Sequence, residues 1–164
     1  MRKEEMARNC EKSVTISRKY KYLSEYPEFK KNGLPVGYLI DKGKVGCGGT
    51  TIALENDINT IICVPFVSLI KNKLDKYKNN KRRKILGVYE GITDKEVIEY
   101  NERKSKCKKI ICTYDSLPRV ARLVGFDYFL LIDELHLLFT NYSFRNKAIR
   151  GVLDIFNKFN TGLL

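Results

Sequence analysis

The stretch Tyr128-Phe129-Leu130-Leu131-Ile132-Asp133-Glu134-Leu135-His136 decides the fold class of this chain. Its first five residues are continuously apolar, which is typical of a strand covered on both faces by helices. Two carboxylates and a histidine follow that run directly. Because open α/β sheets bind ligands at the carboxyl ends of their strands, Asp133, Glu134 and His136 are candidate site residues.

A second segment, Gly43-Lys44-Val45-Gly46-Cys47-Gly48-Gly49-Thr50-Thr51, is a glycine-rich turn that follows the apolar run at 37–40. Such a turn, placed between a strand and a helix, lets backbone N–H groups converge on phosphate oxygens, and the helix dipole adds positive potential. Thr50 or Thr51 would offer a hydroxyl to Mg²⁺. The alternative for this segment alone is a tight structural turn. The predicted nucleotide-binding residues are Gly43, Lys44, Gly46, Cys47, Gly48, Gly49, Thr50 and Thr51.

Together the two segments predict the phosphate loop and the carboxylates of a nucleoside triphosphatase. Asp133 would hold Mg²⁺ directly or through water, Glu134 would polarise the attacking water, and His136 would sense the γ-phosphate or couple it to a partner element. We therefore expect Glu134 and His136 to be catalytic. Two alternatives stay open: a carboxylate pair that caps the next helix, and a histidine with a structural role.

One residue departs from the phosphate-loop pattern G-x-x-x-x-G-K-[ST], because Gly49 stands where the pattern has its lysine. That lysine reaches the β- and γ-phosphates, so its replacement bears directly on hydrolysis. We hypothesise that Lys44 or Lys42, earlier in the same turn, supplies the positive charge from another direction.

Length and composition predict a single soluble domain. The chain has 164 residues, of which 43% are hydrophobic and 30% are charged, enough for one sizeable core and short for two. No apolar run approaches the roughly 20 residues that span a bilayer, and the charged N-terminus does not resemble a secretory signal. We expect a cytoplasmic protein with no membrane partner. The five cysteines form no C-x-x-C pair, so neither a disulfide framework nor a zinc site is predicted.

The net charge is +12, from 31 Lys and Arg against 19 Asp and Glu. The excess is concentrated at 71–84 and 103–109. Such an excess favours a polyanionic partner, since basic side chains neutralise phosphates. A solvated, lysine-rich surface is the alternative.

Alternation of apolar runs with periodic segments predicts the architecture. Strands are expected at 37–40, 60–64, 84–89, 109–113 and 128–132. Helices are expected at 66–77, 93–103 and 144–159, the second opened by the capping box Thr93-Asp94-Lys95-Glu96 and the third capped by Ser143. This order predicts an α/β fold with a three-layer, mostly parallel, doubly wound sheet. Residues 1–32 are expected to form a polar extension on the domain edge.

Four segments resemble motifs of superfamily 2 (DEAD/DEAH) helicases and related translocases. Asp133-Glu134-Leu135-His136 looks like their DExH box, and Gly46-Cys47-Gly48-Gly49-Thr50 resembles their motif I apart from its lysine. Cys63-Val64-Pro65-Phe66-Val67-Ser68-Leu69 and Cys112-Thr113-Tyr114-Asp115-Ser116-Leu117 resemble two segments that contact the nucleic-acid backbone. The four occur in family order and cover about 37–164.

The resemblance implies a RecA-like P-loop NTPase domain at 33–164 that uses ATP and Mg²⁺. It implies Thr50 and Asp133 as metal ligands. Its implied contacts with DNA or RNA are Pro65, Phe66, Thr113 and Tyr114. Such helicases close two RecA-like domains around ATP, and the second domain brings an arginine finger. Since Thr161-Gly162-Leu163-Leu164 resembles the start of a further family strand, we expect a truncated first domain that lacks its second RecA-like domain.

Two other functions fit parts of the pattern. A non-hydrolysing nucleic-acid-binding or scaffold domain derived from such an ATPase is favoured by Gly49, whereas the retained pair Asp133 and Glu134 argues against it. A small P-loop kinase fits less well, because those enzymes need the lysine that position 49 lacks and a lid of arginines.

The substitution Gly49→Lys tests the hypothesis that a lysine earlier in the turn replaces the missing one. If Lys44 or Lys42 supplies the charge, we expect Gly49→Lys to leave the rate of ATP hydrolysis nearly unchanged in a steady-state phosphate-release assay. Creation of ATPase activity in an otherwise inert protein would refute the hypothesis.

Overall fold

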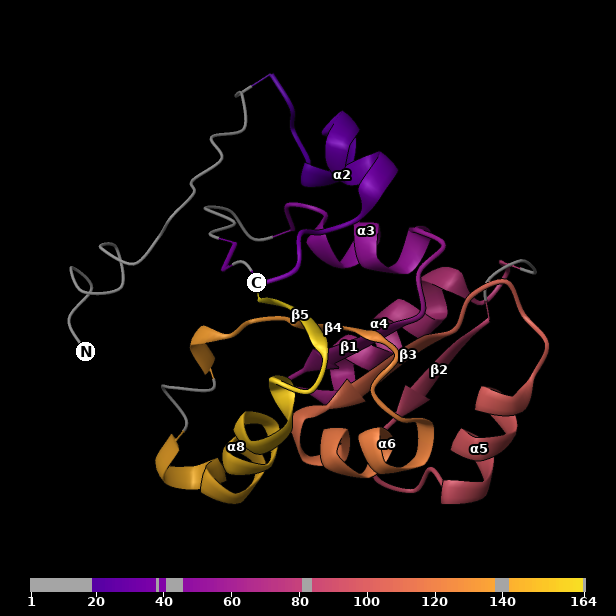
Figure 1. The fold of residues 1–164 in the computed structure, drawn as a ribbon, viewed down its shortest axis with the longest axis vertical. Helices are drawn as coiled ribbons and strands as arrows, with labels where there is room; N and C mark the ends of the chain where they lie inside the picture. Colours follow the sequence, from indigo (N-terminus) through magenta and orange to yellow (C-terminus); the bar gives the residue numbers. More distant parts are fainter. Residues whose placement is uncertain (1–18, 38, 41–45, 81–83, 138–141, 164) are drawn as a thin grey trace.

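The computed structural model describes residues 19–37, 39–40, 46–80, 84–137 and 142–163. They form an all-parallel sheet in the order β2-β3-β1-β4-β5 (Figure 1). The strands β3, β1 and β4 lie at its centre, and β2 and β5 form its two edges. The strands are β1 (Thr60–Val64), β2 (Ile85–Val88), β3 (Lys109–Thr113), β4 (Phe129–Ile132) and β5 (Asn160–Leu163).

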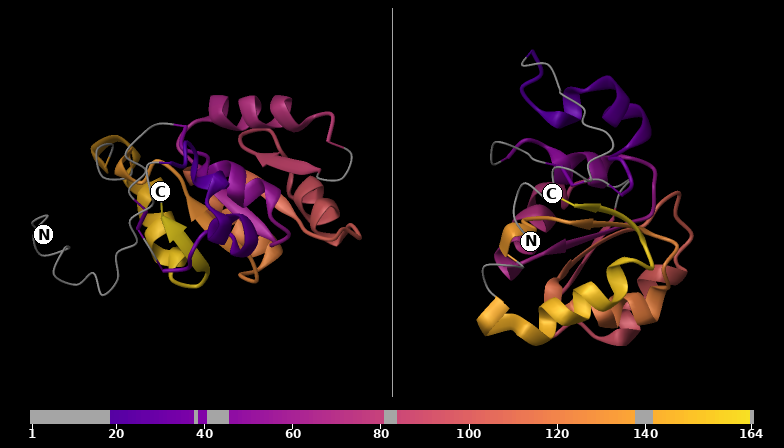
Figure 2. Two further views of the ribbon diagram at one scale, coloured as in Figure 1. Left: turned by 90° about the horizontal axis from the view of Figure 1, so that it is seen from above. Right: turned by 60° about the vertical axis from the view of Figure 1, so that its left-hand side comes forward.

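Helices cover both faces of the sheet, as Figure 2 shows. One face packs against α3 (Gly49–Glu55) and α4 (Val67–Tyr77). The helix α2 (Pro27–Asn32) lies beyond α3 in Figure 1 and contributes Phe29 to the same core. The other face packs against α5 (Asp94–Glu102), α6 (Leu117–Val124) and α8 (Tyr142–Phe156). The 3₁₀ turns η1 (Leu23–Glu25) and η2 (Tyr114–Ser116) precede α2 and α6. The predicted α/β class, with helices alternating with parallel strands, is confirmed.

The two cores explain why the central strands are continuously apolar. Along β1, Ile61 and Cys63 belong to the core under α5, α6 and α8, while Ile62 and Val64 belong to the core under α3 and α4. Successive side chains of a strand point to opposite faces, so a strand covered on both faces has no solvated position. Cys63 lies opposite Cys112 in the register of β1 with β3, and both are buried. Burial raises the pKa of the Cys63 thiol, which keeps it neutral.

Two details of the sequence prediction are corrected. The run at 37–40 was expected to be a strand, but Gly37 has φ +77° and Leu39 makes only an isolated bridge with a 61% exposed side chain. A turn therefore interrupts the run before it can extend. Ser143 was expected to cap the last helix, yet α8 already begins at Tyr142, so Ser143 lies within its first turn.

The ammonium group of Lys109 is buried at the N-terminal edge of the sheet. Lys109 is only 1% exposed. Four oxygens surround its Nζ: Ala53 O at 2.7 Å, Asn56 Oδ1 at 2.6 Å, Ile58 O at 2.6 Å and Thr60 Oγ1 at 3.1 Å. A cation at the C-terminal end of α3 also satisfies helix carbonyls and complements the helix dipole. Lys109 is thus withdrawn from the basic surface that the run at 103–109 predicts.

Within the described parts of the chain, no helix combines the length and apolar character needed to cross a bilayer.

The predicted capping box is present at the start of α5 and can be tested by Thr93→Ala. Glu96 N–H donates to Thr93 Oγ1 at 3.3 Å, while Thr93 N–H donates to Glu96 Oε2 at 2.8 Å. Removing an N-cap hydroxyl leaves helix donors unsatisfied, so we expect a loss of about 1 kcal/mol in the free energy of unfolding at pH 7. Urea denaturation measures it, and an unchanged midpoint would contradict the cap.

The same box predicts a pH dependence. Hydrogen bonds from Thr93 lower the pKa of the Glu96 carboxyl. A lowered folded-state pKa gives stability that is present above the unfolded pKa of about 4.3 and is lost as pH falls through the folded value. Glu96→Gln should therefore be less stable than the native chain at pH 7 but equally stable near pH 3. A difference independent of pH would argue against the charged hydrogen bonds.

Candidate nucleotide site at the carboxyl ends of the strands

The two sequence segments that decide the fold meet through Thr50 and Asp133. Thr50 Oγ1 donates a hydrogen bond of 3.1 Å to Asp133 Oδ2, across 83 positions of sequence. Thr50 lies in the first turn of α3, and Asp133 directly follows β4. The Asp133 N–H donates to Cys63 O at 2.9 Å, so its backbone continues the pairing of β4 with β1. Asp133 is only 9% exposed, which fixes its carboxylate at the sheet edge.

The glycine turn before α3 is held from the N-terminal side of the chain. Gly48 has φ +92° and forms the N-cap of α3, a backbone conformation that favours glycine. A Cβ at Gly48 would lie 3.0 Å from Ser24 Oγ, and Leu23 N–H donates to Cys47 O at 2.6 Å. The turn η1 therefore packs directly on this loop, a contact with no signal in the sequence.

The other predicted nucleotide-binding residues lie in the first turn of α3, in the glycine turn before it, or outside the described residues. Gly49, which stands in place of the lysine, is buried at the first position of α3, and Thr51 follows in the same turn. Gly46 is exposed, with φ +77° and open space where a Cβ would be. Gly43 and Lys44, and the alternative lysine Lys42, lie outside the described residues.

The backbone after Asp133 adopts a conformation unusual for a carboxylate residue. Glu134 has φ +58°, and among the described residues it is the non-glycine with positive φ. Its N–H donates to Asp133 Oδ1 at 3.0 Å, and its side chain lies 3.4 Å from His136 Nδ1, measured from Oε2. The His136 side chain is 65% exposed and that of Glu134 is 27% exposed, so both can meet a ligand from solvent.

Three of the four residues predicted to contact nucleic acid are buried in this structure. Thr113 and Tyr114 are 8% and 2% exposed, and Pro65 is buried as well. Thr113 is the last residue of β3, and Tyr114 and Pro65 directly follow β3 and β1. Thr113 Oγ1 donates to Ser116 Oγ at 3.0 Å, and the Tyr114 hydroxyl points inward. Phe66 differs: its side chain is 45% exposed just past β1. Of this set, Phe66 is the exposed residue.

The Thr50 and Asp133 oxygens fit a magnesium ion better than a transition metal. The described residues hold no cluster of three or more His, Cys, Asp or Glu side chains with metal-binding geometry. Mg²⁺ is commonly held by one or two protein oxygens together with substrate phosphates and waters, in an octahedral arrangement whose neighbouring ligands are roughly 3 Å apart. The separation of Thr50 Oγ1 from Asp133 Oδ2 matches that spacing.

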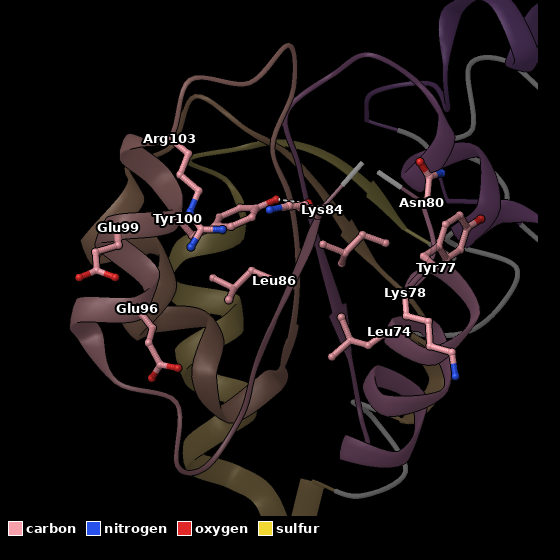
Figure 3. Close-up of a pocket in the computed structure, with 11 residues that line it drawn as sticks. Leu74, Tyr77, Lys78, Asn80, Lys84, Leu86, Glu96, Glu99, Tyr100 and Arg103 are labelled. Carbon is pink, nitrogen blue, oxygen red and sulfur yellow. Dashed lines mark hydrogen bonds between the residues drawn. The ribbon is translucent and has the colours of Figure 1, made fainter. Parts of the chain in front are cut away.

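A separate cavity of about 400 Å³ opens at the N-terminal end of β2. This end of the sheet is opposite to the one that carries Thr50 and Asp133. Figure 3 shows Leu74 of α4 and Lys78, its C-cap, on one side of it and Glu99 of α5 and Arg103, its C-cap, on the other. The Tyr100 hydroxyl donates to Lys84 O at 2.6 Å, and burial raises the pKa of Tyr100. Since β2 begins at this end, the cavity is remote from the carboxylates that follow β4.

The described residues thus define a small α/β domain with an all-parallel sheet and a polar cluster at its carboxyl edge. No protein-family model matches the chain, and no curated protein matches it. Support for a function therefore comes from the residues of this cluster and from their geometry.

Proposed function

We propose that this domain binds a nucleoside triphosphate with Mg²⁺ at the carboxyl ends of β1 and β4. In this proposal it is a RecA-like first domain of a DExH-type helicase or translocase, which couples ATP to movement on DNA or RNA. The observation that carries the proposal is the 3.1 Å hydrogen bond between Thr50 Oγ1 and Asp133 Oδ2. It joins the glycine turn to the carboxylates at the position where parallel α/β sheets bind ligands.

Thr50 and Asp133 are the residues that would hold the metal. When bound, Mg²⁺ would neutralise charge on the phosphate oxygens during phosphoryl transfer. The other contacts with the nucleotide would come from the chain itself. The backbone N–H groups at the start of α3 would bind phosphate oxygens, and Asp133 is already fixed by its own N–H on Cys63 O.

Glu134 and His136 would act on the attacking water and the γ-phosphate. Glu134 is partly exposed beside Asp133, so its carboxylate can accept a hydrogen bond from a water and orient it. His136 lies within 3.4 Å of that carboxylate and would hold it or report phosphate loss to a neighbouring element. With Gly49 in the lysine position and the arginine finger on a separate RecA-like domain, we expect slow turnover by this domain alone.

The substitution Asp133→Ala tests nucleotide binding, with Asp127→Ala as a matched control. Asp127 precedes β4 and Asp133 follows it, so the two variants lose the same charge at opposite edges of the sheet. We expect isothermal titration calorimetry to show Mg²⁺-dependent ATP binding by the native chain and by Asp127→Ala, and its loss in Asp133→Ala. Equal binding by all three proteins, or none at millimolar ATP, would count against the proposal.

A second candidate is a non-hydrolysing domain that binds nucleic acid. The observation that favours it is Gly49, buried at the start of α3 in place of a phosphate-binding lysine. The net charge of +12 is compatible with a polyanion. The exposed Phe66 offers a ring on which a base can stack, an interaction that is sequence-tolerant.

The substitution Phe66→Ala tests polymer binding, with Phe126→Ala as its aromatic control. Phe126 is 38% exposed but precedes β4 at the other edge. Loss of one stacked base costs about 1–3 kcal/mol, so we expect Phe66→Ala to weaken binding of a fluorescent single strand at least fivefold. In anisotropy titrations at several salt concentrations, the plot of log binding constant against log salt concentration should have the same slope for Phe66→Ala as for the native chain, because no charge is removed. Equal weakening by Phe126→Ala would exclude a specific contact at Phe66.

A further inference from the structure

Tyr114 connects β3 to the carboxylate loop through its hydroxyl. The hydroxyl donates to Asp133 O at 2.6 Å and lies 3.2 Å from Glu134 O. The residue is 2% exposed, in η2 directly after β3. Both of these contacts are with backbone carbonyls of the carboxylate residues.

The loop that receives this hydroxyl stores local strain. The left-handed region is unfavourable for a non-glycine residue, and Glu134 has φ +58°. Such a conformation persists where surrounding contacts hold it. The contacts here include the Tyr114 hydroxyl on one side and, on the other, the Leu137 N–H, which donates to Glu134 O at 2.9 Å.

Asp133 and Glu134 differ in how much they depend on Tyr114. Asp133 has two further anchors, since its N–H donates to Cys63 O and its carboxylate accepts from Thr50. Glu134 lies one residue beyond the sheet. Its N–H donates to Asp133 Oδ1, and its Oε2 lies 3.4 Å from His136 Nδ1, but both contacts are within the loop and neither ties Glu134 to a strand. Loss of the Tyr114 hydroxyl should consequently move Glu134 more than Asp133.

We propose that Tyr114 is a positioning residue: through its hydroxyl it holds the backbone of Glu134 in the left-handed conformation that aims the Glu134 carboxylate at the ligand beside Asp133. The turn η2 also contacts α8 and α6, so the orientation of the Glu134 carboxylate depends on these two helices as well. The functional part of this inference rests on the proposed nucleotide site.

Amide hydrogen exchange of Tyr114→Phe tests the positioning role without reference to activity. Phe keeps the buried ring and removes only the hydroxyl. We expect the Leu137 amide to exchange about tenfold faster, because an unpinned Glu134 leaves the left-handed region, while Ile111 and Leu130 in the core strands keep their protection. Unchanged exchange at Leu137, or equal acceleration at Ile111 and Leu130, would overturn the proposal.

A rescue variant sharpens this test. Asn adopts the left-handed conformation at lower cost than most residues. The double variant Tyr114→Phe/Glu134→Asn should therefore recover slow exchange at Leu137, because the loop no longer needs the hydroxyl to stay in place. Fast exchange in the double variant would mean that strain at position 134 is not what Tyr114 holds.

Nucleotide measurements on Tyr114→Phe separate this inference from the proposed function. We expect its Mg²⁺-ATP affinity to stay within about twofold of native while single-turnover hydrolysis slows about tenfold, since misplacing a reacting group costs rate more than binding. An unchanged hydrolysis rate in Tyr114→Phe would overturn the positioning role and leave the nucleotide site standing. If Asp133→Ala binds ATP as the native chain does, the proposed function fails, and hydrogen exchange still decides the role of Tyr114.

Discussion

The burial of the Lys109 ammonium ion is the constraint on which the arrangement of α3 and the central strands depends. An ionised group inside a protein is tolerated only when its donors are satisfied. The oxygens around Lys109 Nζ come from the last turn of α3, the loop at 56–58 and the first residue of β1, while Lys109 itself begins β3. The end of α3 and the beginnings of β1 and β3 must therefore meet around this ammonium group.

That anchor at one end of α3 has a consequence at the other end. α3 spans only Gly49–Glu55, so fixing its C-terminus against Lys109 places its first turn over the opposite edge of the sheet. There Thr50 reaches Asp133, which the pairing of β4 with β1 holds in place. A buried cation and a candidate magnesium site are thus linked by one short helix, with the sheet as the rigid reference between them.

How much of the site the sequence could predict depends on how far apart in the sequence the interacting residues lie. Thr50 and Asp133 were predicted together because a glycine-rich turn and a carboxylate pair after an apolar run form one motif pattern, although the run at 37–40 before the turn makes only an isolated bridge at Leu39. Burial of Thr113 and Tyr114 was not predictable from the same pattern, since a polar residue at the end of a strand can turn inward or outward. The inward turn of Tyr114 depends on carbonyls of Asp133 and Glu134, which lie about twenty residues later. The packing of η1 on the glycine turn likewise has no local signal.

By itself the sequence determined the α/β class, the spans of the central strands and the capping box of α5, because each follows from periodicity or from contacts within a few residues. The tertiary structure alone decided which polar residues are buried, where Lys109 directs its charge and how Glu134 is held. Those outcomes depend on hydrogen-bond partners brought together from distant segments, and a buried polar group takes whichever partner the fold supplies. It also decided that Leu39 stays outside the sheet, since the left-handed turn at Gly37 interrupts a run whose composition favours a strand.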